Sequence, residues 1–159
     1  MAEPGAAPED RGGTPKSAVR LGPPPGGERR GVVAVGRRAG RFLAIRRGAR
    51  VAAPGMVCFP GGHVEPGEEE HAAVVRECRE ELRLDVVAIA CVWRSVTRWG
   101  TTLAWWLVDL PEDALPDPCP VEVAEVLWLS MDELLGHPDL LDGNREFLRR
   151  AVEEGHFGL

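Results

Sequence analysis

The stretch that decides the fold is Gly61–Leu84, with the sequence GGHVEPGEEEHAAVVRECREELRL. Its paired glycines and its Pro-Gly pair predict a turn, and the residues from about Glu69 to Leu82 predict a helix. Apolar side chains recur along that helix at a spacing that places them on one face. This stripe comprises Val75, Cys78 and Leu82. The stretch therefore predicts a glycine turn followed by an amphipathic helix.

Three glutamates, Glu77, Glu80 and Glu81, fall roughly opposite the apolar stripe. A charged helix face is usually only solvated, but Glu77 and Glu81 form a like-charge i,i+4 pair, which costs a helix about 0.2–0.5 kcal/mol. A hard divalent cation such as Mg²⁺ prefers carboxylate oxygen and would offset that repulsion. The close backbone approach that glycine permits would add a carbonyl ligand. The like-charge pair is thus a weakness of the solvated-face interpretation, and a metal-binding face is the alternative.

The spacing of these residue types resembles the Nudix box, G-x5-E-x7-R-E-U-x-E-E-x-G-U, where U is apolar. Gly62, Glu68 and the run Arg76–Glu81 match it, and Phe59–Gly61 (FPG) is similar to the family's usual lead-in. Arg83 departs from the pattern, because the family has a glycine there that ends the helix in a left-handed conformation. The chain thus resembles the Nudix hydrolase superfamily, and within it the MutT-like nucleotide pyrophosphohydrolases.

The resemblance implies an α/β fold, namely a Nudix α/β/α sandwich with a central mixed β-sheet. It also implies Mg²⁺ as cofactor, with Mn²⁺ as a substitute. Glu68 and Arg76 would pair and brace the loop against the helix, whereas His63 would only fill the loop. The implied metal ligands are the carbonyl of Gly61 and the carboxylates of Glu77, Glu80 and Glu81.

Short β-rich runs lie on both sides of this stretch, as expected for a mixed α/β domain. The segment 111–120 carries four prolines and is expected to be a loop. The expected strands are Gly31–Gly36, Arg41–Arg46, Met56–Phe59, Leu84–Val96, Thr101–Leu110 and Val123–Leu129.

Two further helices are expected near the C-terminus. Ser130 is placed to cap a short helix over Met131–Leu135, with Glu133 at the capping-box position. Gly143 or Asn144 is expected to start the last helix, which runs to about Glu154.

Composition bounds the function. The chain has 159 residues, a formal net charge of −6, and 44% hydrophobic and 28% charged residues, which is typical of one soluble globular domain. The acidic balance disfavours binding of nucleic acid polymer but leaves room for a small-molecule nucleotide substrate. Four cysteines without a C-x-x-C pair, no signal peptide and no membrane-length apolar run predict a cytoplasmic protein with reduced thiols. Oligomeric state is not predicted.

The Pro/Gly-rich residues 1–30 are too poor in apolar groups to offset the entropy of ordering, and a flexible N-terminal tail is expected there. Residues 31–159 are expected to form the Nudix domain.

Similarity to MutT-like enzymes extends beyond the box and supplies further candidates. Arg47 ends a strand at the spacing of a phosphate or nucleotide contact, although a solvated arginine is equally expected. Glu122 lies six residues before Trp128, at the spacing of a glutamate that serves the metals or activates water, and Glu125 is the second choice. Asn144 lies close to where MutT-like enzymes have a base-reading asparagine.

Aromatic and cationic side chains on two expected strands allow both a core and a site role. Trp105 and Trp106 alternate in direction, so one is expected in the core while the other either joins it or lines a cleft. Arg94 and Arg98 are expected either to meet phosphate or to be solvated.

The expected reaction is Mg²⁺-dependent hydrolysis of a phosphoanhydride in a nucleoside diphosphate linked to another group, with Glu122 or Glu80 taking a proton from water. A (deoxy)nucleoside triphosphate pyrophosphohydrolase is favoured. Nucleotide sugars, dinucleotides, capped RNA ends and a non-catalytic nucleotide sensor remain the alternatives.

Overall fold

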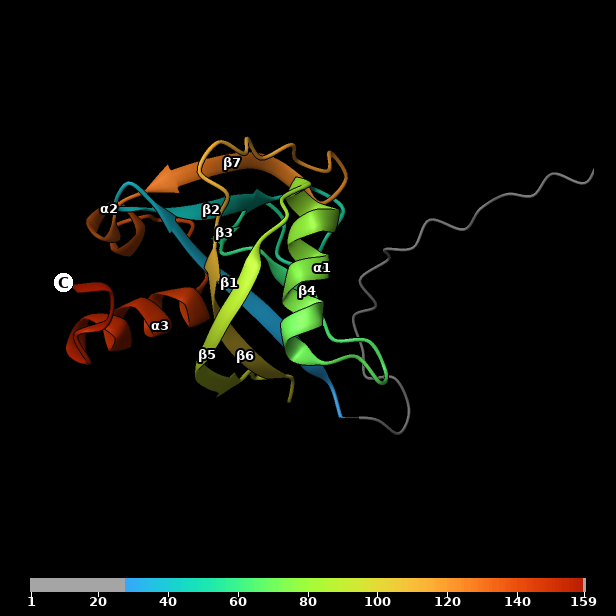
Figure 1. The fold of residues 1–159 in the computed structure, drawn as a ribbon. Coiled ribbons are helices and arrows are strands. Elements are labelled where there is room, and N and C mark those ends of the chain that lie inside the picture. Colours follow the sequence, from blue (N-terminus) through green and yellow to red (C-terminus); the bar gives the residue numbers. More distant parts are fainter. Residues whose placement is uncertain (1–27, 159) are drawn as a thin grey trace, which may run out of the picture.

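The computed structural model describes residues 28–158 and forms a sheet with helices on both sides (Figure 1). The expected flexible tail lies almost wholly outside the described residues, so that expectation stays a prediction. The elements are β1 (Arg30–Arg38), β2 (Arg41–Arg47), β3 (Val57–Cys58), β4 (Gly61–His63), α1 (Glu70–Leu82), β5 (Val87–Val96), β6 (Thr102–Asp109), β7 (Val123–Leu129), α2 (Met131–Leu135), α3 (Asp142–Glu153) and a terminal 3₁₀ turn, η1 (His156–Gly158).

The sheet is mixed. Its strand order is β3-β2-β1-β6-β5, and β4 pairs with the first half of β1 while β7 pairs with β2. Strands β1 and β6 are parallel, whereas the neighbouring pair β5 and β6 is antiparallel. Strand β1 therefore meets β4 near its start and β2 near its end, and the sheet divides between them.

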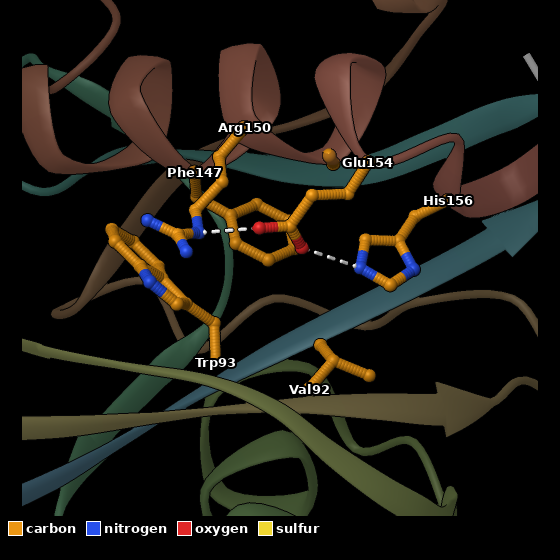
Figure 2. Close-up of a pocket in the computed structure, with 7 residues that line it drawn as sticks. Val92, Trp93, Phe147, Arg150, Glu154 and His156 are labelled. Carbon is orange, nitrogen blue, oxygen red and sulfur yellow. Dashed lines mark hydrogen bonds and ion pairs between the residues drawn. The ribbon is translucent and has the colours of Figure 1, made fainter.

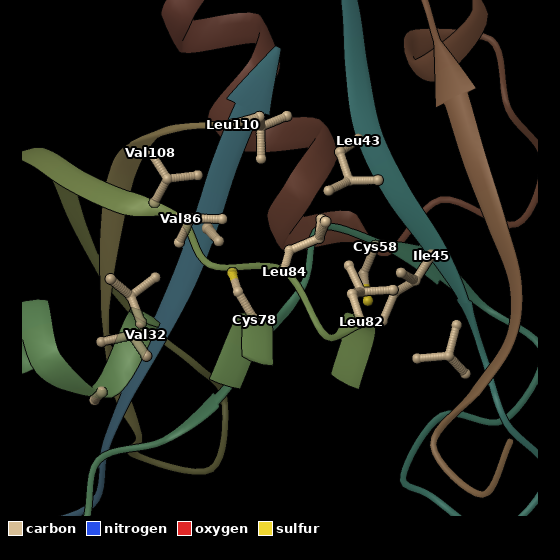
Figure 3. Close-up of a cluster of buried hydrophobic side chains, with 14 of the residues drawn as sticks. Val32, Leu43, Ile45, Cys58, Cys78, Leu82, Leu84, Val86, Val108 and Leu110 are labelled. Carbon is tan, nitrogen blue, oxygen red and sulfur yellow. The ribbon is translucent and has the colours of Figure 1, made fainter. Parts of the chain in front are cut away.

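Strand β1 separates two apolar clusters because its side chains alternate between the faces of the sheet. Val32 and Ala34 join the first cluster together with four residues of α1, part of which is drawn in Figure 3. Val33 and Val35 join the second cluster, which contains Phe147 and Leu148 of α3 and also Trp105. With α1 on one face and α3 on the other, the expected α/β/α sandwich is confirmed.

The expected strands and helices are all present, with two differences. The paired glycines do not form a turn, because Gly61–His63 is the short strand β4, antiparallel to β1. Helix α3 does not begin at Gly143 or Asn144, since its N-cap residue is Leu141 and its first turn starts at Asp142. The capping box of Ser130 and Glu133 is confirmed.

The polarity of α1 also differs in part from the expectation. Cys78 and Leu82 are buried as expected, but Val75 is only partly buried and the innermost positions include Ala73 and Val74. None of the four cysteines is disulfide-bonded. No helix within residues 28–158 has the length and apolar character needed to cross a bilayer.

Arg83 ends α1 in the left-handed conformation that the missing glycine would adopt, with φ 51° and ψ 33°. Its N–H donates to the Arg79 carbonyl at 3.0 Å, which is the bond of an αL C-cap, and the N–H of Leu84 donates to the Cys78 carbonyl at 3.3 Å. The helix exit expected of glycine is therefore kept, at the cost of a Cβ in a strained region.

We expect Arg83→Gly to stabilise the protein by about 0.5–1 kcal/mol, because glycine adopts the left-handed conformation without strain. The greater conformational entropy of glycine in the unfolded chain offsets part of this stabilisation. The lost ion pair with Asp117 spans 3.4 Å between largely exposed side chains and contributes little. Thermal unfolding measures the change, and Arg83→Ala, which keeps the strain, is the control. An Arg83→Gly protein less stable than Arg83→Ala would contradict the strain.

Candidate active site

The backbone of β4 and the residue before it is held in place from two sides. The Pro60 carbonyl accepts a hydrogen bond from the Ala34 N–H at 2.8 Å, and the Gly61 N–H donates to Oε2 of Glu81 at 3.1 Å. A Cβ at Gly61 would lie 2.1 Å from the Val32 carbonyl oxygen, and one at Gly62 would lie 2.3 Å from the carboxyl carbon of Glu77. Close approach of backbone thus requires glycine at 61, whereas at 62 a Cβ would displace the Glu77 side chain.

Arg76 joins the loop to the helix. Its Nε and Nη2 bond the two carboxyl oxygens of Glu68 at 2.8 and 3.0 Å, and Nη2 also donates to the His63 carbonyl at 2.8 Å. This bidentate pair lowers the pKa of Glu68 and has the fork geometry of the strongest ion pairs. The bracing contact implied by the sequence resemblance is present.

The same guanidinium bonds two of the predicted metal ligands. Nη1 of Arg76 lies 3.0 Å from Oε1 of Glu77 and 3.1 Å from Oε2 of Glu80. The Arg76 charge therefore offsets part of the repulsion among the carboxylates that the sequence predicts.

Glu77 and Glu81 are withdrawn from water. The side chain of Glu77 is 12% exposed, and Glu81 is 7% exposed, on the buried side of α1 rather than opposite the apolar stripe. Burial, with repulsion from Glu80 and Glu122, raises the pKa of Glu77 to about 7 against the pull of Arg76. Burial and then the Glu77 charge raise the pKa of Glu81 well above its usual range.

Glu80 is placed differently from its two neighbours. Its side chain is 55% exposed and bonds Arg76. Among residues 28–158 no three acidic, His or Cys side chains lie in a ready metal-binding arrangement. Glu80 has to turn away from Arg76 before it can join Glu77 and Glu81.

Glu122 and Arg47 reach the same centre from the other part of the sheet. The charge of Glu122 raises the pKa of both Glu77 and Glu81, whereas the charge of Arg47 lowers that of Glu81. Between Arg46 and Arg47 the β2–β7 register shifts, and the Glu122 carbonyl accepts the Gly48 N–H at 2.8 Å. This irregularity brings the end of β2 beside Glu122.

The second choice, Glu125, lies elsewhere. It is an exposed residue of β7 and pairs with Arg46 at 3.2 Å, and Arg46 in turn pairs with Asp139 at 2.8 Å. These contacts give Glu125 a surface ion pair and favour Glu122 as the further glutamate of the site.

The donor set suits a hard divalent cation. The buried Glu81 and the partly buried Glu77, both with raised pKa values, supply oxygen ligands and excess negative charge, together with a third carboxylate nearby and a backbone segment pressed against Glu77. Such a pair costs free energy when it is ionised and uncompensated. The residues therefore fit Mg²⁺ or Mn²⁺ in a way that a solvated helix face does not.

We expect Mg²⁺ to stabilise the protein more at pH 8 than at pH 6. Glu77 has a folded-state pKa near 7, raised above its usual value of 4.5, so its contribution to metal-free stability is present below about pH 4.5 and lost as the pH rises through 7. Metal binding releases that proton. At pH values below the pKa of Glu77, the apparent Mg²⁺ affinity therefore rises by up to about tenfold for each unit of increasing pH. Thermal unfolding with and without Mg²⁺ across this range measures it, and a pH-independent shift would contradict the assignment.

Asn144 is buried at the start of α3, where its Oδ1 accepts the Phe59 N–H at 2.8 Å. The N-cap residue is Leu141, so the expectation that Asn144 starts the last helix is wrong. The contact between Asn144 and the loop was not predicted, although the sequence carries a signal for it. Asn144 shares a helix face with Phe147, Leu148 and Ala151, and a polar side chain on an apolar face needs a buried partner.

Trp105, Trp106 and Arg94 are used in the fold, whereas Arg98 is exposed. Trp105 is fully buried and stacks on Phe147 with ring centroids 4.7 Å apart, while Trp106 packs against the first cluster. Arg94 holds both carboxyl oxygens of Glu70 at 2.8 Å.

A separate pocket lies between β5 and α3 (Figure 2). Trp93 and Phe147 form its apolar wall, and Glu154 spans its rim by bonding Arg150 at 2.8 Å and His156 at 2.9 Å. None of the candidate site residues lines it. The acidic centre, and not this pocket, is the candidate active site.

Comparison with known proteins agrees with this geometry. The family model of the NUDIX domain matches residues 27–151. A CTP pyrophosphohydrolase of Escherichia coli K12 is 33% identical over 110 residues, which are 67% of this chain and 79% of that protein. Among solved structures, a MutT protein from Methanosarcina mazei has a TM-score of 0.71 at 26% identity, over 80% of this chain and 95% of the other. The E. coli ORF135 protein has a TM-score of 0.65 at 26% identity, over 79% and 89%. The chain belongs to the Nudix family and is a Nudix hydrolase that acts on phosphoanhydrides.

Proposed function

We propose that the protein hydrolyses a (deoxy)nucleoside triphosphate to the nucleoside monophosphate and pyrophosphate in a Mg²⁺-dependent reaction, with Mn²⁺ as a substitute. The observation that carries the proposal is the burial of Glu77 and Glu81 beside Glu122, behind a loop that Arg76 fixes. The CTP pyrophosphohydrolase activity of the E. coli relative supports a triphosphate substrate.

The metal ligands in this proposal are the Gly61 carbonyl and the carboxylates of Glu77, Glu80 and Glu81. A bound divalent ion supplies charge neutralisation at the pyrophosphate and a lowered pKa for water. Arg76 and Glu68 keep the loop and α1 in register, because their bidentate pair fixes both.

Proton transfer is assigned to a glutamate of the same centre. Glu122 accepts the proton of the attacking water as the water oxygen bonds to phosphorus and the phosphoanhydride bond between the α- and β-phosphates breaks, and Glu80 is the alternative base. Glu122 is favoured because its charge acts on both Glu77 and Glu81, whereas Glu80 points to Arg76.

Substrate contacts are assigned to two residues. Arg47 is proposed to meet a phosphate oxygen, and its charge acting on Glu81 supports this assignment. Asn144 commits Oδ1 to the Phe59 N–H, and only its Nδ2 is left to donate to a base.

A panel of nucleotides assayed with Mg²⁺ for phosphate and pyrophosphate release tests the proposal. The panel contains CTP, dCTP, dGTP, ATP, ADP-ribose, a diadenosine polyphosphate, a nucleotide sugar and capped RNA. Pyrophosphate release from a triphosphate, with CTP among the best substrates, is the expected result. Turnover confined to the other classes would replace the triphosphate assignment, and tight binding without product from any member would indicate a sensor.

A further inference from the structure

Asn144 occupies a position where an apolar side chain would be expected. It lies on the face of α3 that carries Phe147, Leu148 and Ala151, and it is 7% exposed. Burial of a side-chain amide without a hydrogen bond costs free energy, so the partner of the Asn144 amide indicates the role of this residue. The donor in that bond is a backbone N–H, which fixes Oδ1 as the atom that faces it.

The backbone that Asn144 holds is the segment leading to the proposed metal ligand. Phe59 donates its N–H to Asn144 at 2.8 Å, and Pro60, which has no N–H, offers only its carbonyl, to the Ala34 N–H. Gly61 donates its N–H to Glu81. Three consecutive residues are therefore held by α3, β1 and α1 in turn, one bond each.

The Phe59 side chain adds a second link to the same helix. Its ring meets the Phe147 ring edge-to-face, with centroids 6.1 Å apart, and both rings are buried. Helix α3 thus fixes Phe59 by its backbone through Asn144 and by its side chain through Phe147. A shift of Asn144 would move Phe59, and the rigid Pro60, joined to Phe59 and Gly61 by peptide bonds, would pass that movement to Gly61.

We propose that Asn144 is a positioning residue, which holds the segment Phe59–Gly61 so that the Gly61 carbonyl faces the Glu77 and Glu81 carboxylates. This role rests on the proposed function, because it concerns the same metal-binding centre. It differs from reading the base, since it uses Oδ1 and acts whatever nucleotide is bound.

Two substitutions of similar size separate the roles. Asn144→Asp keeps an oxygen that accepts the Phe59 N–H but removes the Nδ2 donor, whereas Asn144→Leu removes both and leaves the Phe59 N–H unpaired. Glu146→Leu, at an exposed site in the same helix, is the matched control. Both readouts are taken without nucleotide: hydrogen exchange of the Phe59 and Gly61 amides in metal-free protein, and Mn²⁺ affinity by electron paramagnetic resonance.

In wild type and Asn144→Asp, the Phe59 amide should exchange as slowly as amides of the buried strands. In Asn144→Leu it should exchange at least about tenfold faster than those amides, which corresponds to the loss of a buried hydrogen bond. Mn²⁺ affinity should fall about tenfold in Asn144→Leu and stay within about twofold of wild type in Asn144→Asp and Glu146→Leu.

The proposal would be overturned if Asn144→Leu kept the amide protection and the Mn²⁺ affinity of the wild type. Rapid exchange of the Phe59 amide in the wild-type protein would also overturn it, and this measurement can be made even if Asn144→Leu does not fold. Failure of the proposed function is a different result: no nucleotide is hydrolysed, while the exchange and Mn²⁺ measurements still decide the role of Asn144.

Discussion

Glu81→Gln should lower kcat/KM for the triphosphate by at least about a thousandfold, because a metal-bound substrate gains several kcal/mol of transition-state stabilisation that needs this carboxylate. The amide oxygen of glutamine can still accept the Gly61 N–H, so the loop is expected to stay in place. Glu77→Gln should act in the same way. Steady-state kinetics with Mg²⁺ measures both, and full activity in either variant would contradict the metal assignment.

The same substitution should make the metal-free protein more stable at pH 8. The pKa of Glu81 is raised in the folded state, so its ionisation costs stability as the pH rises, and a neutral glutamine avoids that cost. Addition of Mg²⁺ should then raise the unfolding temperature of the wild type but not of Glu81→Gln. Glu69→Gln removes an exposed charge at the start of the same helix and should change neither property.

Gly61→Ala should destabilise the protein by about 2–4 kcal/mol, because the new Cβ would lie 2.1 Å from the Val32 carbonyl oxygen and neither backbone can move without separating β4 from β1. The unfolding temperature should fall by about 5–15 °C.

Gly62→Ala is its matched partner. There the Cβ meets the end of the Glu77 side chain, which can turn aside, so the fold should lose about 1 kcal/mol or less. Turnover should nevertheless fall about a hundredfold, since Glu77 is displaced from the centre. Equal stability of the two variants, or an unchanged rate in Gly62→Ala, would contradict the close packing of this segment.

The sequence was sufficient for the order of the elements other than β4, because each of them carries a local signal. The β-rich run of β1, the buried positions Cys78 and Leu82 of α1 and the capping box at Ser130 are all readable from neighbours in the chain. What it could not show was long-range pairing. The glycines of β4 were read as a turn because a three-residue strand is defined only by its partner, β1.

For the candidate site, too, the sequence predicted one contact but not the environment of each side chain. The Arg76–Glu68 pair is implied by the resemblance to the Nudix box and is present. The different environments of the glutamates do not follow from spacing, because Glu80 and Glu81 are adjacent in the chain while one is exposed and the other buried. The link from Asn144 to Phe59 spans 85 residues and depends on how α3 packs.

The most direct test of the central claim is a crystal structure of the protein with Mn²⁺, with the ion located by anomalous scattering. The predicted result is a peak within direct coordination distance of the Gly61 carbonyl and of the Glu77 and Glu81 carboxylates. A peak elsewhere, with Glu77 and Glu81 making no contact to the ion, would contradict it.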